Sequence, residues 1–461
     1  MTAALRVVID QGVRRRGTTL AGGSPRRVMR LTPAGLRVLR ALEQGTDGSA
    51  AARVLRRRLL DAGIAHPRPQ RRDTGGEVTV VVPVRDRPGE LERCLAALEP
   101  EVRVIVVDDG SRDHGAVAAV AARHGARLVH RRVAGGPAAA RNAALREVRS
   151  ELVAFLDSDC VPAGGWLRAL AGHFEDPLVG AVAPRVRPVA GTRRSALARY
   201  LAARSPLDMG RRPAAVRPGG PVSYLPAAAL LVRRSALAAG FDEQLRYGED
   251  VDLVWRLRDA GWRVRYDPSV EVAHEEPDAL RQALGRRFRY GTAAAPLIDR
   301  HPRELAPAVL PPWPTLVAVL TLSGRRRAAA VLGCQQGAAF AQRVAALGVP
   351  RAWGARWFAE ATYTAIVSLT RYAVMFALPV ALAYAWRARR PLALTPLVVP
   401  ALDEWRRREP TLDPLRWIAI AIADDAAYGA GVCWGCVQSG DVRPLIPRLV
   451  ATRLDGSARP Q

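Results

Sequence analysis

Apolar strand patterns alternate with helical patterns through the middle of this 461-residue chain. The runs Val78–Val84, Val102–Val107 and Leu152–Leu156 are almost wholly apolar. The helical patterns between them are Leu91–Leu98, Val117–Arg123 and Ala138–Val148. Continuous apolar strands need cover on both faces, and strands joined through helices run parallel. We therefore expect an α/β fold with a doubly wound, mostly parallel sheet over residues 77–300.

Two further zones flank this region. Residues 1–75 are rich in Arg and combine a strand pattern at Val28–Leu31 with helical patterns at Ala34–Leu42 and Ala50–Ala62. The Pro- and Gly-rich stretch at 66–76 is typical of a linker. Residues 305–461 are apolar and helical in pattern. The length suits two to three domains, so we predict domains at 1–75, 77–300 and 305–461.

The chain is strongly basic, with a formal net charge of +26. All 69 basic residues are Arg. This pattern resembles a bias in the coding sequence, so the positive charge is weaker evidence about function. A basic balance still favours anionic ligands such as nucleotide phosphates or acidic lipid surfaces. The basic stretches hold few aromatic residues and no RNA-binding signature, so we expect no nucleic-acid partner.

Cysteine usage indicates a reducing compartment. An odd number of cysteines at irregular spacing argues against a disulfide framework. They are Cys94, Cys160, Cys334, Cys433 and Cys436. The last two form a C-x-x-C without a second pair or a nearby His, and we interpret them as small buried residues. The N-terminus lacks an apolar signal-peptide core, so we expect a cytoplasmic protein.

The tail contains two long apolar runs. Tyr372–Trp386 spans 15 residues, short of the about 20 that a spanning helix needs. Leu415–Val437 is longer, but charged residues interrupt it. We favour interfacial helices that rest on the inner face of the cell membrane over a soluble helical subdomain. Arg387, Arg389 and Arg390 would suit anionic headgroups.

Acidic residues follow three of the predicted strands. They are Asp86 after the first strand, Asp108 and Asp109 after the second, and Asp157 and Asp159 after Leu152–Leu156. In open α/β sheets, ligands bind beyond the carboxyl ends of the strands. We therefore expect these carboxylates to converge at one edge of the sheet.

The motif Asp157-x-Asp159 ends a buried strand with two negative charges. It is either a polar strand end that faces water or a cation site. Alternate residues on an extended strand point to the same side, so both carboxylates could address one site. Mg²⁺ and Mn²⁺ prefer oxygen ligands, and the neighbouring acidic strand ends favour such a metal.

The segment Asp108-Asp109-Gly110-Ser111 follows the second strand. A carboxylate here could accept a hydrogen bond from a base N–H or a ribose hydroxyl, and Gly110 lets the backbone pass close to a ligand. The alternative is a turn in which Asp or Ser caps the next helix.

Two glycines, Gly135 and Gly136, precede the next predicted helix. A helix N-terminus suits a phosphate group, and Arg141 could bind a diphosphate in bidentate fashion. The alternative is an Ala-rich core helix with a surface Arg.

Two acidic residues, Glu249 and Asp250, come directly before the helical pattern Val251–Ala260. These acids could simply match the helix dipole. Alternatively, a carboxylate in a cleft can act as the general base toward an alcohol. His274 ends a strand-like run and could be a neutral ligand to the same metal, although a lone His is more often structural.

The order and spacing of these motifs resemble glycosyltransferase family 2 enzymes with the GT-A fold. The motifs are Val78–Val84, "VIVVDDGS" at 104–111, "GGPAAARNAAL" at 135–145, "FLDSD" at 155–159 and "GEDVDLVWRLRDAGWRVRYDP" at 248–268. The resemblance covers residues 77–290 and implies a nucleotide-sugar donor and a divalent metal, Mg²⁺ or Mn²⁺.

The resemblance also implies a role for each matching residue. Asp250 would be the catalytic base, supported by Glu249. The donor nucleotide would contact Pro83, Asp86, Asp108, Asp109 and Arg141. The metal and diphosphate would contact Asp157, Asp159 and His274. The Gln-x-x-Arg-Trp motif of processive synthases is absent, since residues 286–290 read Arg-Arg-Phe-Arg-Tyr, which puts synthase-like extrusion in doubt.

The fuller chain looks like one subfamily, the mycofactocin-system glycosyltransferases. The matching pieces are "VIDQGVRRRGTTLAGGSPRRVMRLTPAGLRVLRAL" at 8–42, "RRFRYGTAAAPLIDRHP" at 286–302 and "RWIAIAIADDAAYGAGVCWGC" at 416–436. Residues 1–75 also resemble a PqqD-like winged-helix peptide-recognition domain. The subfamily implies successive β-1,4 transfer of glucose from UDP-glucose to premycofactocin, a peptide-derived redox cofactor.

A single displacement would invert the anomeric centre, so an α-linked donor would yield a β-glycoside. Three alternatives stay open. The acceptor could be a lipid or a cell-envelope polysaccharide. The enzyme could be a sugar nucleotidyltransferase, which also joins acidic strand ends to a metal. The chain could instead be a non-catalytic peptide-binding scaffold, although carboxylates stand at every expected position.

Overall fold

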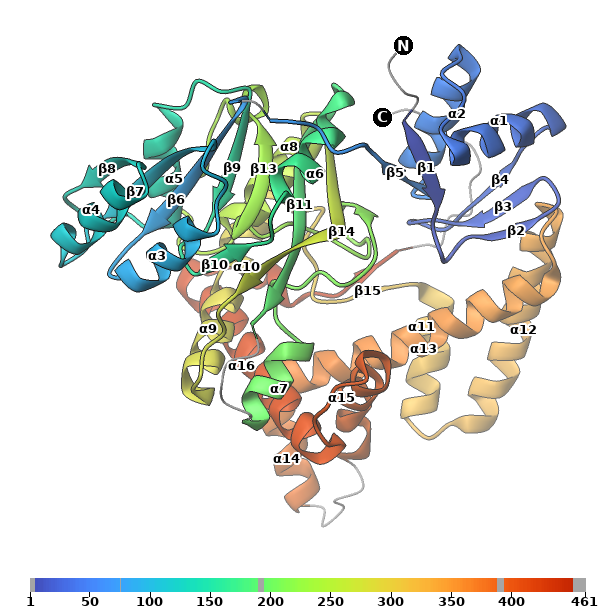
Figure 1. Ribbon diagram of the computed structural model, residues 1–461. Coiled ribbons are helices and arrows are strands. Elements are labelled where there is room, and N and C mark those ends of the chain that lie inside the picture. The colour runs from blue at the N-terminus through green and yellow to red at the C-terminus, as the bar shows by residue number, and fades with distance from the viewer. Residues whose placement is uncertain (1–4, 75, 190–194, 388–393, 451–461) are drawn as a thin grey trace. The chain divides into compact units, whose positions relative to one another are not determined.

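The computed structural model describes residues 5–74, 76–189, 195–387 and 394–450. The chain divides into two compact units (Figure 1). One unit, here called the sheet unit, contains Leu5–Val7 and His66–Asp278. The other, the helical unit, combines Val8–Ala65 with the chain from Ala279 onward. The two ends of the sequence, which sequence patterns treat as separate zones, therefore contribute to one unit.

A nine-stranded sheet forms the centre of the sheet unit. Its strands are β6 (Val78–Val84), β7 (Arg103–Asp109), β8 (Arg127–Arg131), β9 (Leu152–Leu156), β10 (Cys160–Pro162), β11 (Val179–Pro188), β12 (Ala214–Ala215), β13 (Ala229–Arg233) and β14 (Arg263–His274). The helices of this unit are α3 (Pro88–Ala96), α4 (His114–Arg123), α5 (Pro137–Leu145), α6 (Trp166–Ala171), α7 (Ala196–Ala203) and α8 (Glu249–Asp259).

The sheet confirms the predicted α/β class and adds an antiparallel part. The order is β10-β14-β11-β13-β9-β6-β7-β8, with β12 paired to β14. Strands β9, β6, β7 and β8 are parallel neighbours. Strand β13 runs antiparallel to both β9 and β11, while β11 and β14 pair in parallel. The parallel half contains the predicted strands, and the rest of the sheet is mixed.

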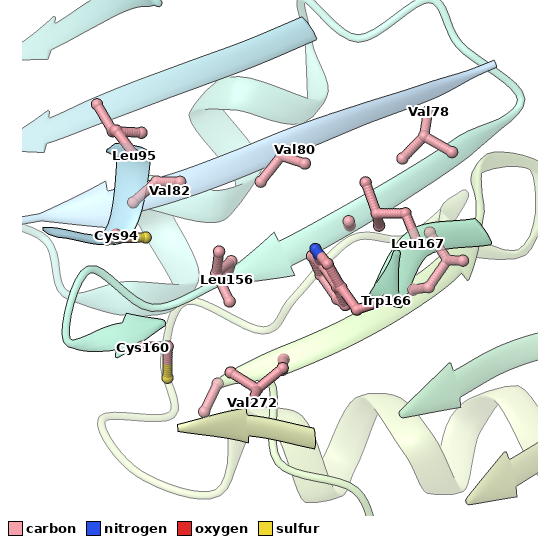
Figure 2. Packing of buried hydrophobic residues seen from close by; sticks show 14 of the residues in the cluster. Val78, Val80, Val82, Cys94, Leu95, Leu156, Cys160, Trp166, Leu167 and Val272 are labelled. Atoms are coloured by element: carbon pink, nitrogen blue, oxygen red, sulfur yellow. The ribbon is translucent and has the colours of Figure 1, made fainter. Parts of the chain in front are cut away.

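Alternating side chains of the parallel strands pack on opposite faces of the sheet. On one face, Val78, Val80 and Val82 join a buried cluster with Cys94 of α3 and Trp166 of α6 (Figure 2). The intervening Val81 is equally buried but lies outside that cluster, and α5 packs against β6 and β7. Burial on both faces explains why these strands read as continuous apolar runs.

The N-terminal part of the helical unit is a small α+β structure. Its elements are β2 (Arg14–Arg16), β3 (Thr19–Gly22), β4 (Arg27–Arg30), α1 (Pro33–Gln44) and α2 (Ala50–Asp61). Strands β2, β3 and β4 form an antiparallel sheet. Two other short strands, β1 (Arg6–Ile9) and β5 (Ala65–Arg68), pair with each other. The linker prediction for 66–76 is therefore wrong for residues 66–68, which lie in β5.

Helices make up the rest of that unit. They are α9 (Leu280–Thr292), α10 (Ala294–Arg300), α11 (Pro312–Leu322), α12 (Arg326–Ala346), α13 (Arg351–Phe376), α14 (Leu378–Arg387), α15 (Thr395–Arg408) and α16 (Pro414–Ser439). Two-residue strands β15 (Val309–Leu310) and β16 (Arg448–Leu449) pair in parallel. Among the described helices, none alone is long and apolar enough to cross a membrane. Helices α13 and α14 meet that criterion only together, across an 87° bend.

Helices α9 and α16 pack through glycines. A Cβ added at Gly291 would collide with the carbonyl oxygen of Tyr428, and one added at Gly431 would collide with that of Phe288. By contrast, a Cβ at Gly285, also in α9, would meet only the end of the Arg289 side chain at 3.8 Å. The two helices therefore touch backbone to backbone, with no room for a methyl group.

We predict that Gly291→Ala lowers the free energy of unfolding of the helical unit by about 1–3 kcal/mol, because overpacking must separate two backbones. The matched control Gly285→Ala should be neutral or stabilise by up to about 1 kcal/mol, since Ala favours an open helical position. Urea unfolding followed by circular dichroism measures both. Equal stabilities for the two variants would contradict the close packing.

Candidate active site

The ends of β6 and β7 are tied together by Asp86. Its backbone lies in the left-handed region at φ 57°. Its N–H donates to Ser111 Oγ at 3.0 Å, and its Oδ1 accepts from the Arg112 N–H at 2.7 Å. Positive φ is uncommon for a non-glycine residue, so these two hydrogen bonds hold a turn that fixes where the Asp86 carboxylate lies.

Asp109, the last residue of β7, organises the loop before α5. Its carboxylate accepts from the backbone N–H of Gly136 at 2.7 Å and of Gly135 at 3.0 Å. It also pairs with Arg131 of β8. Gly136 has φ 88°, a conformation that favours glycine. The predicted glycine motif is therefore shaped by a carboxylate from the neighbouring strand.

Asp108 lies one residue earlier and is fully buried. Its Oδ1 accepts from the Ser111 N–H at 2.9 Å. Its Oδ2 lies 2.7 Å from His114 Nδ1 and 3.0 Å from His130 Nδ1. Burial alone would raise the pKa of Asp108, but the hydrogen bonds from Ser111 and His114 hold it below its usual value, so the carboxylate stays ionised.

Arg141 connects the acidic strand end to α8. Its side chain is 3% exposed. It donates to Asp157 Oδ1 at 2.7 Å and to Glu249 Oε1 at 2.8 Å, and lies over the Phe241 ring. Burial on its own would lower the pKa of this guanidinium. The charges of Asp157 and Glu249 outweigh that effect, so the pKa lies above its usual value. Arg141 therefore stays charged and links two acidic residues in the interior. It is not the surface Arg of the alternative interpretation.

Asp159 faces different partners. Its Oδ2 accepts from Arg87 at 2.6 Å, and its Oδ1 lies 3.7 Å from His274 Nε2. Asp157 and Asp159 follow β9 in a turn rather than extending the strand, so strand alternation does not set their directions. They are held by separate contacts to α5 and to the β6–α3 loop.

Asp157, Asp159 and His274 offer the types of ligand that a divalent cation takes. Two carboxylates and one imidazole form a donor set that accepts a divalent metal. Burial raises the pKa of Asp159; the charge of Asp157 adds to the rise, while His274 and Arg87 oppose it. A bound cation would relieve the repulsion between the two carboxylates. Within the described residues, however, the ligand atoms of Asp157, Asp159 and His274 do not all lie within 4.8 Å of one another.

Asp250, partly buried at the start of α8, has the raised pKa of a base. Its Oδ2 accepts from the Ala227 N–H at 3.2 Å and its Oδ1 from the Val251 N–H at 2.8 Å. Burial raises its pKa to about 7; Glu249 adds to the rise, and Arg141 opposes it. A carboxylate that titrates near neutrality can take a proton from an alcohol.

Sequence patterns did not single out two residues that shape this site. Arg87, the partner of Asp159, stands beside Asp86 in the chain. Asn142 is the only Asn in the chain. Its amide donates to the Phe241 carbonyl at 2.8 Å and accepts from the Phe241 N–H at 2.9 Å. Its rarity was the available signal. Pro83, by contrast, lies half-buried within β6.

Comparison with known proteins identifies the family. The family model of "Glycosyl transferase family 2" matches residues 79–241. The "Pre-mycofactocin glycosyltransferase" of Mycobacterium tuberculosis (strain CDC 1551 / Oshkosh) is 38% identical over 460 residues, which cover 94% of this chain and 95% of that protein. The chain belongs to glycosyltransferase family 2. The matched residues include Asp86, Asp108, Asp109, Arg141 and the D-x-D turn of the site described above.

Other proteins match a smaller part of the chain. An N-acetylglucosaminyl-diphospho-decaprenol L-rhamnosyltransferase of Mycobacterium tuberculosis (strain CDC 1551 / Oshkosh) is 35% identical over 43% of this chain and 76% of its own. A mannosyltransferase from Pyrobaculum calidifontis, solved with GDP-Man and Mn²⁺, is 20% identical. It covers 73% of this chain and 88% of its own, with a TM-score of 0.38.

We predict that kcat/KM of this family 2 enzyme rises with pH through about 7, because the Asp250 carboxyl is protonated below its pKa and ionised above it. Glu249→Gln removes a negative charge that raises this pKa, so the midpoint should move to lower pH. Glu243→Gln, which removes an exposed carboxylate that accepts from the Asn142 amide and does not affect the pKa of Asp250, should leave the midpoint in place. The measurement is a pH–rate profile of each variant; a midpoint unmoved by Glu249→Gln contradicts the assignment.

Proposed function

We propose that this enzyme transfers a sugar, with inversion, from a UDP-sugar to an acceptor hydroxyl, with Asp250 as the general base. The observation that carries the proposal is the chain of contacts from Asp157 through Arg141 to Glu249. This buried link joins the D-x-D turn to the residue beside the candidate base. It fixes the distance between the metal–diphosphate end and the proton-accepting end of one site.

The donor nucleotide is proposed to lie over the ends of β6 and β7. Asp86 and Asp109 contact the nucleoside, with Pro83 beside them. The turn at Gly135 and Gly136 opens α5 toward the phosphates, and a helix N-terminus favours negative charge. Asp108 belongs to the same donor region and, because it is buried, acts by positioning the segment that carries Ser111. Arg141 acts through Asp157 in the same way.

The diphosphate end is proposed to contain the divalent metal. Asp157, Asp159 and His274 would hold Mg²⁺ or Mn²⁺. When bound, such a metal stabilises negative charge on a departing diphosphate. Arg87 supplies a further positive charge at Asp159.

The acceptor hydroxyl is proposed to approach Asp250 on the side opposite the leaving group. Asp250 takes the hydroxyl proton as the oxygen forms a bond to the anomeric carbon and the bond to UDP breaks. One displacement inverts that carbon, so an α-linked donor yields a β-glycoside. The Ala227 and Val251 N–H groups hold the carboxylate in place during the proton transfer.

We infer glucose as the sugar and premycofactocin as the acceptor, with β-1,4 linkage between successive glucose units. The support is the likeness to the pre-mycofactocin glycosyltransferase along 94% of this chain, together with the fold of residues 8–65. The antiparallel sheet and two helices of that region fit a PqqD-like peptide-recognition domain, which suits a peptide-derived acceptor. A lipid or cell-envelope acceptor is the second candidate, since one partial relative is named for a decaprenol-linked substrate.

The test of the base is Asp250→Asn, with UDP release measured in the presence of premycofactocin, UDP-glucose and Mn²⁺. We expect turnover to fall roughly 10²–10⁴-fold, the usual contribution of a positioned base, with little change in UDP-glucose affinity. The matched control is Asp259→Asn at the exposed other end of α8. Near-normal turnover in Asp250→Asn, or release of pyrophosphate instead of UDP, would refute the proposal.

We also propose that α14 rests on the cytoplasmic face of a membrane. Val380 is 71% exposed and Trp386 is 88% exposed, although α14 is apolar along its length. Trp and Tyr favour the membrane–water interface, and Arg387 at the helix end suits anionic headgroups. Arg389 and Arg390 lie outside the described residues.

We predict that Trp386→Ser weakens binding to vesicles containing anionic lipid by roughly tenfold, because an interfacial aromatic anchor is lost. Trp313→Ser on α11 removes an exposed Trp of the same unit and should change binding little. Co-sedimentation with anionic and with neutral vesicles measures both. Equal loss in the two variants would exclude α14 as the contact.

A further inference from the structure

Three ligand-type side chains converge at the corner between β7, α4 and β8. Asp108 is the penultimate residue of β7, His114 begins α4 and His130 lies in β8. The chain holds 7 His, and two of them direct Nδ1 at the same oxygen, Asp108 Oδ2. Their ring centroids lie 3.9 Å apart. None of these three side chains belongs to the D-x-D centre.

The spacing is close to that of ligands around one small cation. The two Nδ1 atoms lie 2.7 and 3.0 Å from the carboxylate oxygen. Ligands in a tetrahedral zinc site are about 3.4 Å apart, given bond lengths of about 2.0–2.2 Å. A shift of less than about 1 Å in each imidazole would open the cluster enough. One ligand atom from each residue already lies within 4.8 Å of the others.

The ligand types select the metal. Two imidazoles with one carboxylate suit Zn²⁺, whereas Mg²⁺ prefers an all-oxygen shell. The carboxylate is fully buried and ionised, and its other oxygen accepts from the Ser111 N–H. A hydrogen bond to the remaining oxygen is the usual way to orient a ligating carboxylate. The imidazoles are 43% and 36% exposed, which leaves an open side for a water ligand.

We propose that Asp108, His114 and His130 form a second metal site that binds Zn²⁺, separate from the Mg²⁺ or Mn²⁺ site of the D-x-D turn. In the bound state each imidazole ligates through Nδ1 as its neutral Nε2–H tautomer. The proton that Nδ1 shares with Asp108 leaves to solvent and a solvent proton is taken up at Nε2, so one cation is held by two nitrogens and one oxygen.

A cation at this site would order the segment after β7, which lies in the proposed donor-binding region. Asp108 holds the Ser111 N–H, and Ser111 Oγ accepts from the Asp86 N–H. Asp109, the next residue, holds the glycine turn before α5. A cation that locks Asp108 to α4 and β8 therefore orders the segment from which Asp86 and Asp109 are presented. Its role is to position these residues, because its three ligands are separate from the D-x-D turn and from Asp250.

The test is binding of Zn²⁺ and of Co²⁺ to the metal-stripped full-length chain in saturating Mg²⁺. Calorimetry gives the stoichiometry, and the visible absorption of Co²⁺ reports tetrahedral nitrogen and oxygen ligation. We expect one Zn²⁺ per chain, with affinity at least about 100-fold weaker in His114→Gln and in His130→Gln. The control His124→Gln removes an imidazole bound to Glu92 at the end of α4 and should bind normally.

A second control separates the two metal sites. Asp159→Asn should keep the Zn²⁺ and Co²⁺ binding, because that carboxylate belongs to the D-x-D centre. Absence of tetrahedral Co²⁺ bands in the unsubstituted chain would overturn the proposal and leave a hydrogen-bonded cluster only. So would binding that survives both His114→Gln and His130→Gln, or binding that is lost in Asp159→Asn.

Discussion

The buried guanidinium of Arg141 is the interaction on which the site depends. It joins Asp157 at the end of β9 to Glu249 at the start of α8, two residues far apart in the chain. A buried ion pair that loses one partner leaves an uncompensated charge, which is strongly destabilising. Burial raises the pKa of Asp250, Glu249 adds to the rise, and Arg141 opposes it. The contact that holds the start of α8 therefore also influences the acidity of Asp250, the proposed base.

Much of the sheet unit could be predicted from the sequence. The predicted strands Val78–Val84 and Leu152–Leu156 match β6 and β9 residue for residue, because a strand buried on both faces leaves a continuous apolar run. The antiparallel insertion of β13 could not be predicted, since a buried antiparallel strand between other strands reads like a parallel one. The convergence of Asp86, Asp109 and Asp157 follows from topology, but the partners of each carboxylate do not.

The partners were unpredictable because they are set by side chains remote in sequence. Arg141 resembled a surface residue that could reach a diphosphate, yet it is buried between two carboxylates. Asp109 resembled a free nucleoside contact, yet it also holds the glycine turn. The local sequence pattern does not predict whether a charged residue is buried or where its side chain points. A charged side chain is stable in the interior only with a partner, and that partner can lie many residues away. The joining of residues 8–65 with the C-terminal helices is unpredictable for the same reason.

That joining gives the helical unit its character. Ala21 and Val28 of the N-terminal sheet pack with Phe340, Val344 and Trp357 of α12 and α13. In the same unit, α9 and α16 approach backbone to backbone at Gly291 and Gly431, and Arg287 of α9 pairs with Asp424 of α16 beside that contact. A side chain can change rotamer when two helices shift, but backbone atoms in contact cannot, so the glycine contacts leave little freedom for relative movement. A tilt or slide of α9 would therefore move α16 with it. The two helices behave as one rigid element next to Ala279, where the chain returns to this unit.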